Sequence, residues 1–374
     1  MRYKLVIVAL ISLFVLTSCW DQHLLKDARL IYGASFDLNE DNSLQTTIAI
    51  RALTPETISG TEHGSANIVL SAKGNTLRDT RIAQEKELAG QFASNKARVF
   101  ILGEELAKTD LYSLLDILYR DPRFSIRALL VVTKGRGENI LRLNKVQERF
   151  ISEEVLGLVQ EAEDKSYVSR ETIQSIFPVM FDPGEDFHLP LIKKTEENQT
   201  KIVGMALFNG KKYTGKDLEG DASTVLLLLK NELGETNRFS FVIHPEEEEG
   251  RQQIVSFTVS DSNSKVNITT TNDNKVSVDI DLKLKVNIVE YPKEDIIDDA
   301  VEEITRELTE KFTEKANHVT QILQEANCDG LGIGRELMAF HPKVWKQLDW
   351  KEEYPKVNFS TTVDVEIIGT GILK

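Results

Sequence analysis

The clearest pattern in the chain is a strict alternation of apolar and polar residues between Val276 and Ile288. Such alternation predicts a strand with one buried and one solvent-facing side. A second alternation from Val357 to Ile367 predicts a last strand in the same sheet. Residues 295–326, between them, predict the longest helix, with one apolar stripe along it. The stripe consists of Val301, Ile304, Leu308, Phe312, Ala316, Val319 and Leu323.

The apolar stripe of this helix has two interpretations. It can cover the buried face of the neighbouring sheet, or it can form a coiled coil with a partner. The first is favoured, because the adjacent sheet offers an apolar face that needs a cover. We therefore expect a C-terminal domain that is a mainly antiparallel, twisted sheet covered by a long helix.

Shorter periodic segments precede this domain. Residues 29–135 alternate predicted strands and helices around one core. The strands are Leu30–Asp37, Leu44–Leu53, Ile68–Ala72, Lys96–Leu102 and Ser125–Thr133, and the helices are Thr76–Phe92 and Leu106–Tyr119. Residues 144–185 are mostly helical, and a polar segment at 182–200 indicates a boundary. The predicted fold class is α+β, multidomain and mixed α/β. We expect an α/β domain at 29–143, a small, mostly helical domain at 144–198, and the antiparallel sheet with its long helix at 199–374.

The amino terminus has the three parts of a secretory signal. Arg2 and Lys4 precede an apolar run from Leu5 to Leu16, which is shorter than the roughly 20 residues of a membrane-spanning helix. Leu16-Thr17-Ser18-Cys19 fits a bacterial lipobox, in which Cys19 takes a diacylglyceryl group and becomes the first mature residue. The alternative is an ordinary signal peptide with a chance cysteine. We expect a signal peptide at 1–18 and a lipid-anchored tether at 19–28.

Composition narrows the classes of partner. The chain has 374 residues, 41% of them hydrophobic, and a formal net charge of −14. This is a globular composition whose acidity disfavours nucleic-acid binding. The only two cysteines are Cys19 and Cys328. If Cys19 carries lipid, no intramolecular disulfide can form, and Cys328 is expected to be structural.

No motif for catalysis or metal binding stands out. The chain lacks an H-E-x-x-H pair, a G-x-S-x-G elbow and a Walker loop. The glycine-rich segment Gly330–Gly334 follows a helix rather than a strand, so it predicts a corner rather than a dinucleotide loop. The acidic run Glu246–Glu249 is interpreted as a solvated loop. Trp345 and Trp350 are interpreted as half-buried core residues, with binding of a partner as the alternative.

Four segments together give the chain a resemblance to a known family. They are Cys19-Trp20-Asp21, Gly204-Met205-Ala206-Leu207-Phe208-Asn209-Gly210-Lys211, Asp329–Gly334, and the ending with Pro342, Trp345, Trp350, Pro355 and the last strand. In order and spacing they resemble the Ger(x)C lipoproteins, the C subunits of nutrient germinant receptors in endospore-forming bacteria. One departure is Gln22-His23-Leu24-Leu25, where the family often has an Arg-Glu pair.

The resemblance implies three mixed α/β domains and a place on the outer face of the inner spore membrane. It also implies a complex with two integral membrane subunits, A and B, a requirement in spore germination, no enzymatic activity, and no cofactor besides the lipid on Cys19. One alternative is a solute-binding lipoprotein of an importer, which the long antiparallel alternation disfavours. Another is an envelope hydrolase, but the adjacent carboxylates Glu104 and Glu105 would face apart.

Overall fold

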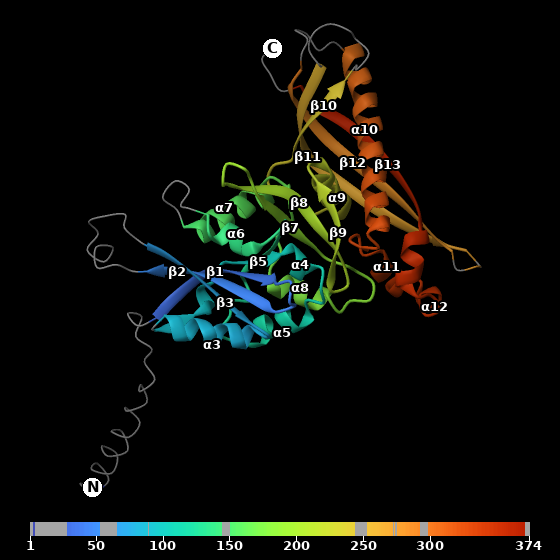
Figure 1. Cartoon of the computed structure of the whole chain (residues 1–374). Coiled ribbons are helices and arrows are strands. Elements are labelled where there is room, and N and C mark those ends of the chain that lie inside the picture. Colours follow the sequence, from blue (N-terminus) through green and yellow to red (C-terminus); the bar gives the residue numbers. More distant parts are fainter. Residues whose placement is uncertain are drawn as a thin grey trace.

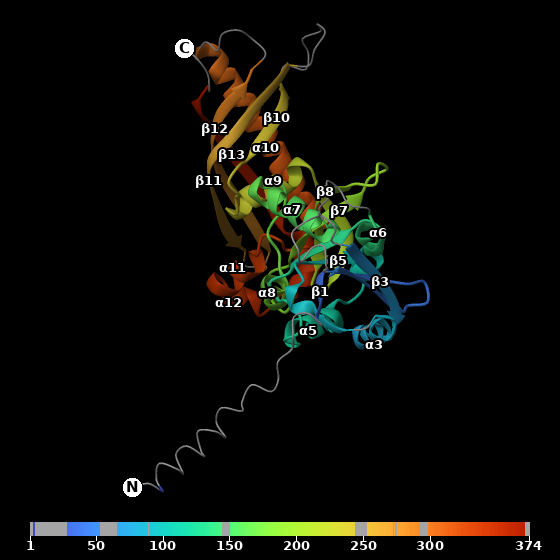
Figure 2. The ribbon, with the colours of Figure 1, turned by 90° about the vertical axis from the view of Figure 1, so that its left-hand side faces the viewer.

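The computed structural model describes residue 3 and residues 28–52, 66–88, 90–143, 150–243, 253–271, 273, 275–291 and 298–370. Two sheets organise these residues (Figure 1). The first sheet, β1 to β9, occupies the amino-terminal half, and the second, β10 to β13 with α10 against it, stands at the other end of the molecule (Figure 2). Cys19 and the other residues of the predicted signal and tether lie outside the described segments, apart from Tyr3 and Ala28.

The first sheet has the order β3-β2-β1-β5-β6-β7-β8-β9, with β4 paired to the start of β1. Its strands are β1 (Ala28–Leu38), β2 (Leu44–Ala52), β3 (Ala66–Gly74), β4 (Gln91–Ala93), β5 (Val99–Gly103), β6 (Leu129–Thr133), β7 (His188–Lys194), β8 (Thr200–Asn209) and β9 (Lys212–Glu219). The central strands β1, β5, β6 and β7 are parallel, and the flanking pairs are antiparallel. Every residue of β5 and β6 is buried, as expected for parallel strands covered on both faces.

Helices cover both faces of this sheet. They are α3 (Leu77–Glu87), α4 (Glu104–Ala107), α5 (Tyr112–Arg120), α6 (Gly137–Leu141), α7 (Ile151–Asp164) and α8 (Ile173–Val179). Successive side chains of a strand point to opposite faces of the sheet, so β5 contributes to two hydrophobic cores. Phe100 packs in the core with α5 and α8, and Ile101 packs in the core with α7. Among the described helices, none combines the length and apolar composition needed to cross a bilayer.

The second sheet has the order β10-β11-β12-β13. Its elements and neighbours are α9 (Asp221–Lys230), β10 (Arg238–Ile243), β11 (Gln253–Thr270), β12 (Val276–Glu290), α10 (Asp298–Glu325), α11 (Ile333–Phe340), α12 (Pro342–Trp345), α13 (Trp350–Glu353) and β13 (Asn358–Gly369). Two of its pairings are antiparallel, and β13 joins β12 in parallel after the crossover through α10. This confirms the predicted mainly antiparallel sheet with its long helix.

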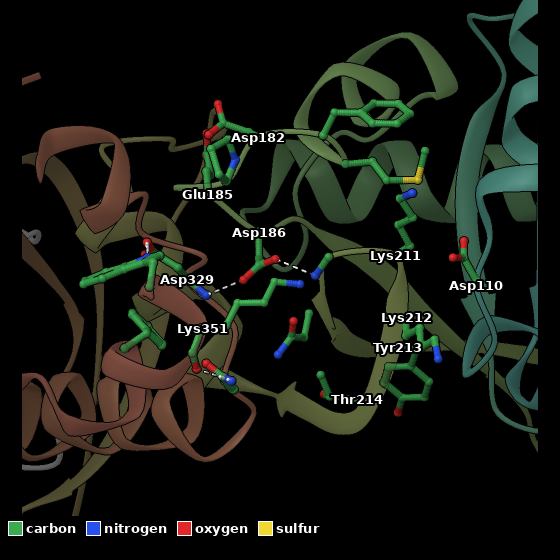
Figure 3. Close-up of a pocket in the computed structure, with 18 residues that line it drawn as sticks. Asp110, Asp182, Glu185, Asp186, Lys211, Lys212, Tyr213, Thr214, Asp329 and Lys351 are labelled. Carbon is green, nitrogen blue, oxygen red and sulfur yellow. Dashed lines mark hydrogen bonds between the residues drawn. The ribbon is translucent and has the colours of Figure 1, made fainter. Parts of the chain in front are cut away.

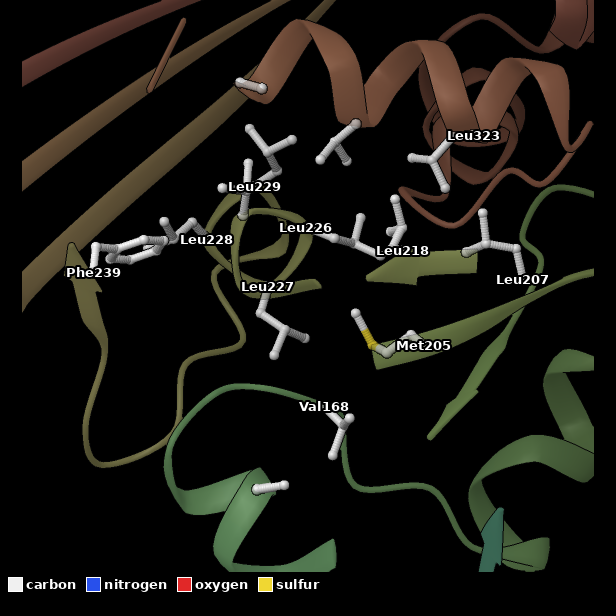
Figure 4. Packing of buried hydrophobic residues seen from close by; sticks show 14 of the residues in the cluster. Val168, Met205, Leu207, Leu218, Leu226, Leu227, Leu228, Leu229, Phe239 and Leu323 are labelled. Atoms are coloured by element: carbon white, nitrogen blue, oxygen red, sulfur yellow. The ribbon is translucent and has the colours of Figure 1, made fainter. Parts of the chain in front are cut away.

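The apolar stripe of α10 lies against the sheet, as the sequence favoured. Ile304, Leu308 and Phe312 are fully buried. The Phe312 ring meets those of Phe239 and Phe241 edge-on, each at 5.1 Å between centroids. The same hydrophobic core continues through α9 to α7 and the first sheet (Figure 4). The two sheets therefore share one core.

The predicted middle domain, 144–198, differs from the structure. Its helices do not form a core of their own, because α7 and α8 pack on the first sheet in separate cores. The predicted boundary at 198/199 falls in the turn between the paired strands β7 and β8, so the first sheet crosses it.

Two predicted helices differ from those in the structure. The helix predicted at 76–92 ends at Glu87, and Gln91–Ala93 forms β4 instead, paired to the start of β1. The helix predicted at 106–119 is interrupted between α4 and α5, where the Leu111 amide donates to the carbonyl of Lys211 on a distant turn. In the C-terminal half, the segments predicted at 254–259 and 265–271 form one continuous strand, β11.

The end of α7 carries a buried carboxyl group that makes stability depend on pH. Burial raises the pKa of Glu163 to about 7, and among the described residues its Oε1 has no hydrogen-bond partner. The folded state therefore holds a proton that the unfolded state releases between pH 4.5 and 7, so this group's contribution to stability falls as pH rises through that range. We expect Glu163→Gln, which does not titrate, to gain melting temperature relative to the parent between pH 5 and pH 8. Calorimetry at the two pH values checks this, and a constant difference would contradict it.

Candidate functional site

A pocket of about 640 Å³ lies where the first sheet meets the helices that follow α10 (Figure 3). Its lining comes from four segments, within residues 180–186, 209–214, 327–329 and 350–354, and from Asp110. We call it the junction pocket. Three of the four segments behind the family resemblance contribute to it: the end of 204–211, the start of 329–334, and Trp350 of the last segment.

Asp186 connects two of these segments from its position just before β7. Its Oδ1 accepts a hydrogen bond from the Gly210 amide at 2.6 Å, and its Oδ2 accepts one from the Asp329 amide at 2.9 Å. The Asp186 amide in turn donates to the Asp329 carbonyl at 3.0 Å. Burial raises the pKa of Asp186, although the two amides and the charge of Lys351 act in the opposite direction. One carboxylate therefore fixes the β8–β9 turn to the chain after α10.

Asp329 is the second buried carboxylate of the site. Its Oδ1 accepts from the Ile333 amide at 2.9 Å, and its Oδ2 accepts from the Gly334 amide and from Trp350 Nε1, each at 2.8 Å. The amides belong to the first turn of α11, so the carboxylate caps that helix. Burial, the largest cause, raises the pKa of Asp329 to about 7. The glycine-rich segment forms the predicted corner, and Asp329 holds it in place.

Gly334 permits a close approach at this corner. A Cβ at this position would lie 2.6 Å from Gly184 Cα and 2.6 Å from Trp350 Nε1. The segment 182–186 and the start of α11 thus pack backbone against backbone, where only glycine fits. The glycine content of this segment serves packing, in agreement with the sequence interpretation.

The two tryptophans differ in exposure. Trp350 exposes 6% of its surface, whereas Trp345 is partly buried with its ring centroid 5.9 Å from that of Trp350. Trp350 therefore lies in the core, as the sequence analysis favoured, but it is buried rather than half-buried, and its indole donates to Asp329. Binding of a partner at these residues stays a prediction. Cys19, the predicted lipidation site, lies outside the described residues.

The open side of the pocket carries charge of both signs. Lys211 Nζ lies 4.8 Å from the ring centroid of Tyr112 and 5.2 Å from that of Phe181. These are cation–π distances. Asp110 and Asp182 line the same opening. Sequence reasoning missed Asp186, Lys211 and Phe181 as members of a site, because nothing in their local pattern links segments so far apart in the chain.

The thiol and the two buried carboxylates at this site take part in packing and hydrogen bonding. Cys328 is fully buried beside it, and burial raises the pKa of this thiol well above the usual value, which keeps it protonated. Across the described segments, no group of three or more His, Cys, Asp or Glu side chains is placed to hold a metal ion. The carboxylates of Asp186 and Asp329 accept hydrogen bonds from backbone amides, and Asp329 also accepts one from the Trp350 indole. The hydrogen bonds of the two carboxylates join separate segments of the chain.

Comparison with known proteins identifies the family. Residues 21–194 match the model of the spore germination protein N-terminal domain, and residues 203–371 match that of the spore germination B3/GerAC-like C-terminal domain. The chain belongs to the Ger(x)C family of spore germination proteins. The earlier resemblance is thereby confirmed, and the two models together span both sheets.

Relatives within the Ger(x)C family extend over nearly the whole chain. Spore germination protein GerQC of Bacillus cereus is 22% identical over 367 residues, 97% of each chain. Spore germination protein KC of Bacillus subtilis (strain 168) is 22% identical over 398 residues, 98% of this chain and 96% of that protein. The crystal structure of the GerBC protein matches with a TM-score of 0.60 at 16% identity, covering 90% of this chain and 97% of that one. That structural match supports the fold.

Proposed function

We propose that this protein is the lipid-anchored C subunit of a nutrient germinant receptor and is required for spore germination. A diacylglyceryl group on Cys19 holds it on the outer face of the inner spore membrane, where it joins integral membrane subunits A and B. It acts as a non-enzymatic scaffold and signalling subunit and needs no cofactor besides the lipid. Family membership favours this function over that of an importer's solute-binding lipoprotein.

The observation that carries the scaffold role is the pair of buried carboxylates at the junction pocket. Asp186 accepts from the Gly210 amide of the first sheet and from the Asp329 amide after α10, and Asp329 accepts three donors from residues 333–350. The two carboxylates therefore connect the first sheet to the chain segments that follow α10. A single core shared by both sheets adds to the same stiffness. A stiff, anchored body suits a subunit that braces the external loops of membrane partners.

The anchor is tested through Cys19. The protein, tagged after Lys374, is recovered from detergent-solubilised inner membranes of spores. We expect two integral membrane proteins to copurify with the parent chain, and Cys19→Ala to reduce membrane retention and copurification more than tenfold. Two acyl chains give a stable anchor, whereas a chain without them has none. Gln22→Ala, near the same site, is the matched control and should behave as the parent.

Two outcomes would contradict parts of this proposal. Recovery of the lipidated chain alone would remove the partnership with A and B. Full germination by spores whose Cys19→Ala chain is soluble and unlipidated would remove the anchoring role. An importer protein, by contrast, would bind a small solute tightly without partners, which calorimetric titration of the purified chain would detect.

A further inference from the structure

The amino ends of the parallel strands β1, β5 and β6 lie along one border of the first sheet. The register pairs Gly33 with Val99 and Val99 with Leu129, so the residues that precede β5 and β6 lie side by side. α3 reaches the same border, because Arg81 donates to the Phe92 carbonyl at 2.6 Å and to Ser94 Oγ at 3.0 Å. We call the cations gathered there the basic edge. They are Arg78, Arg81, Lys96, Arg98, Arg123 and Arg127.

The basic edge contrasts with the acidity of the whole chain. Residues 77–98 contain five Lys and Arg against three Asp and Glu, and residues 112–127 contain three against two, in a chain with formal charge −14. Arg81 pairs with Glu85, and Arg123 pairs with Asp121. Four cations have no ion-pair partner in the part of the chain that the structure describes, and all four are exposed: Arg78, Lys96, Arg98 and Arg127.

Exposed apolar side chains accompany these charges. A groove of about 220 Å³ between α3 and α5 is lined by Arg78, Arg81 and Arg123 together with Ile82 and Ile117. Glu85 and Asp121, the ion-pair partners of Arg81 and Arg123, line it as well. The two isoleucines expose 44% and 37% of their surface. Cationic and apolar groups side by side are typical of surfaces that lie at a bilayer interface, where charged heads meet phosphates and aliphatic groups enter the headgroup layer.

The chain also leaves the fold toward its amino terminus at this edge. β1 begins at Ala28, which pairs with Gln91 of β4, the strand next to Arg81. Cys19 precedes Ala28 by nine residues, which can span about 30 Å at most. A lipid on Cys19 would therefore keep the basic edge near the bilayer. α3 and α5 lie at the end of the molecule remote from the second sheet (Figures 1 and 2).

We propose that the basic edge and the α3–α5 groove bind anionic phospholipid headgroups, so that the first sheet rests on the membrane by the amino ends of its parallel strands. The proposal depends on the lipid anchor proposed above. Charges act on a membrane over about 8 Å at physiological salt, so the local basic edge, rather than the acidic remainder, determines this contact. Each Lys or Arg near an anionic surface strengthens binding about fivefold.

Vesicle sedimentation tests the contact without partner subunits. The probe is the mature chain, residues 19–374 with Cys19→Ser; no buried side chain of the described core precedes Ile31, so removing residues 1–18 leaves that core intact. We expect at least tenfold tighter binding to phosphatidylcholine vesicles containing one third phosphatidylglycerol than to phosphatidylcholine alone. Arg78→Glu with Lys96→Glu should weaken binding to the anionic vesicles at least tenfold.

A matched control separates local from overall charge. Lys265→Glu with Lys283→Glu makes the same change of charge on exposed positions of β11 and β12 in the second sheet. This variant should bind anionic vesicles as the parent does. Equal binding of the parent to both kinds of vesicle would overturn the proposal, and so would an equal loss in both double variants. Unchanged melting temperatures show that all variants fold.

A partner protein could instead occupy the basic edge, and the experiment distinguishes this. If Arg78→Glu with Lys96→Glu leaves vesicle binding unchanged but lowers copurification of integral membrane proteins in detergent, the edge binds an acidic protein surface and the lipid proposal is overturned. Failure of the proposed receptor function would give a different result from failure of the lipid proposal. Copurification would then fail for the parent chain, while vesicle binding without partners would be unaffected.

Discussion

Replacing Asp329 with Ala is expected to lower the free energy of unfolding by about 3–5 kcal/mol. The substitution leaves the amides of Ile333 and Gly334 and the Nε1 of Trp350 buried without their acceptor. Each unsatisfied buried donor costs about 1–3 kcal/mol, and part of this is offset because a buried carboxylate disappears. Urea denaturation, followed by tryptophan fluorescence, measures the change, and Trp350 itself reports on the site.

The matched control is Asp349→Ala in the same part of the chain. Asp349 is exposed and caps α13 with a single hydrogen bond to the Lys351 amide, so its loss should cost only about 0.5–2 kcal/mol. Asp329→Asn should fall between the two. Both carboxylate oxygens of Asp329 accept, so an amide must turn its NH2 group toward an N–H donor. Equal losses for the two alanine variants would refute the role assigned to Asp329.

The sequence predicted the second sheet well because its strands are buried on one face only. β12 alternates buried and solvent-facing residues along nearly its whole length, and the stripe of α10 matches the face that it covers. Apolar residues repeat every two positions in such a strand and about every 3.6 positions in such a helix. Both repeats can be recognised in the sequence without knowing which element packs against them. The predicted fold class and the long helix followed directly from these two patterns.

Helices and strands whose bounds reflect contacts with residues far away in the chain could not be predicted from local periodicity. At the break between α4 and α5, the Leu111 amide donates to the carbonyl of Lys211, a distant contact that the local sequence pattern does not reveal. β4 is a strand only because it pairs with the start of β1. The predicted middle domain failed for the same reason, since α7 and α8 take their cores from strands elsewhere in the chain.

The junction pocket shows the limit of sequence reasoning at the site. Asp186 and Asp329 are 143 positions apart, and each lies in a loop without periodicity. The resemblance drew attention to 204–211, 329–334 and Trp350 separately and said nothing of their contact. The structure brings them together around two buried carboxylates, which suggests that residues shared with the family in these segments serve the joint between the two halves of the protein.

Gly204 provides the second large expected effect, at the opposite end of the 204–211 segment. Its φ of +152° is one that side-chain-bearing residues rarely adopt, and an added Cβ would overlap the carbonyl oxygen of Leu218 on β9 and lie 2.8 Å from Ser223 Oγ. Gly204→Ala must therefore push β9 away and weaken the bond from Ser223 Oγ to that carbonyl. Strain and overpacking together should cost about 3–5 kcal/mol.

Gly157→Ala makes the same chemical change where there is room for it. Gly157 lies within α7, and an added Cβ would meet nothing within 4 Å. That variant should gain about 0.5–1 kcal/mol, because alanine loses less conformational freedom in a helix than glycine does. Urea denaturation of the purified variants and immunoblotting of spore membranes should agree. Gly204→Ala should lower stability and abundance together, whereas Gly157→Ala should lower neither. If Gly204→Ala kept parental stability, the close approach of β8 and β9 would not be what requires glycine at this position of the family segment.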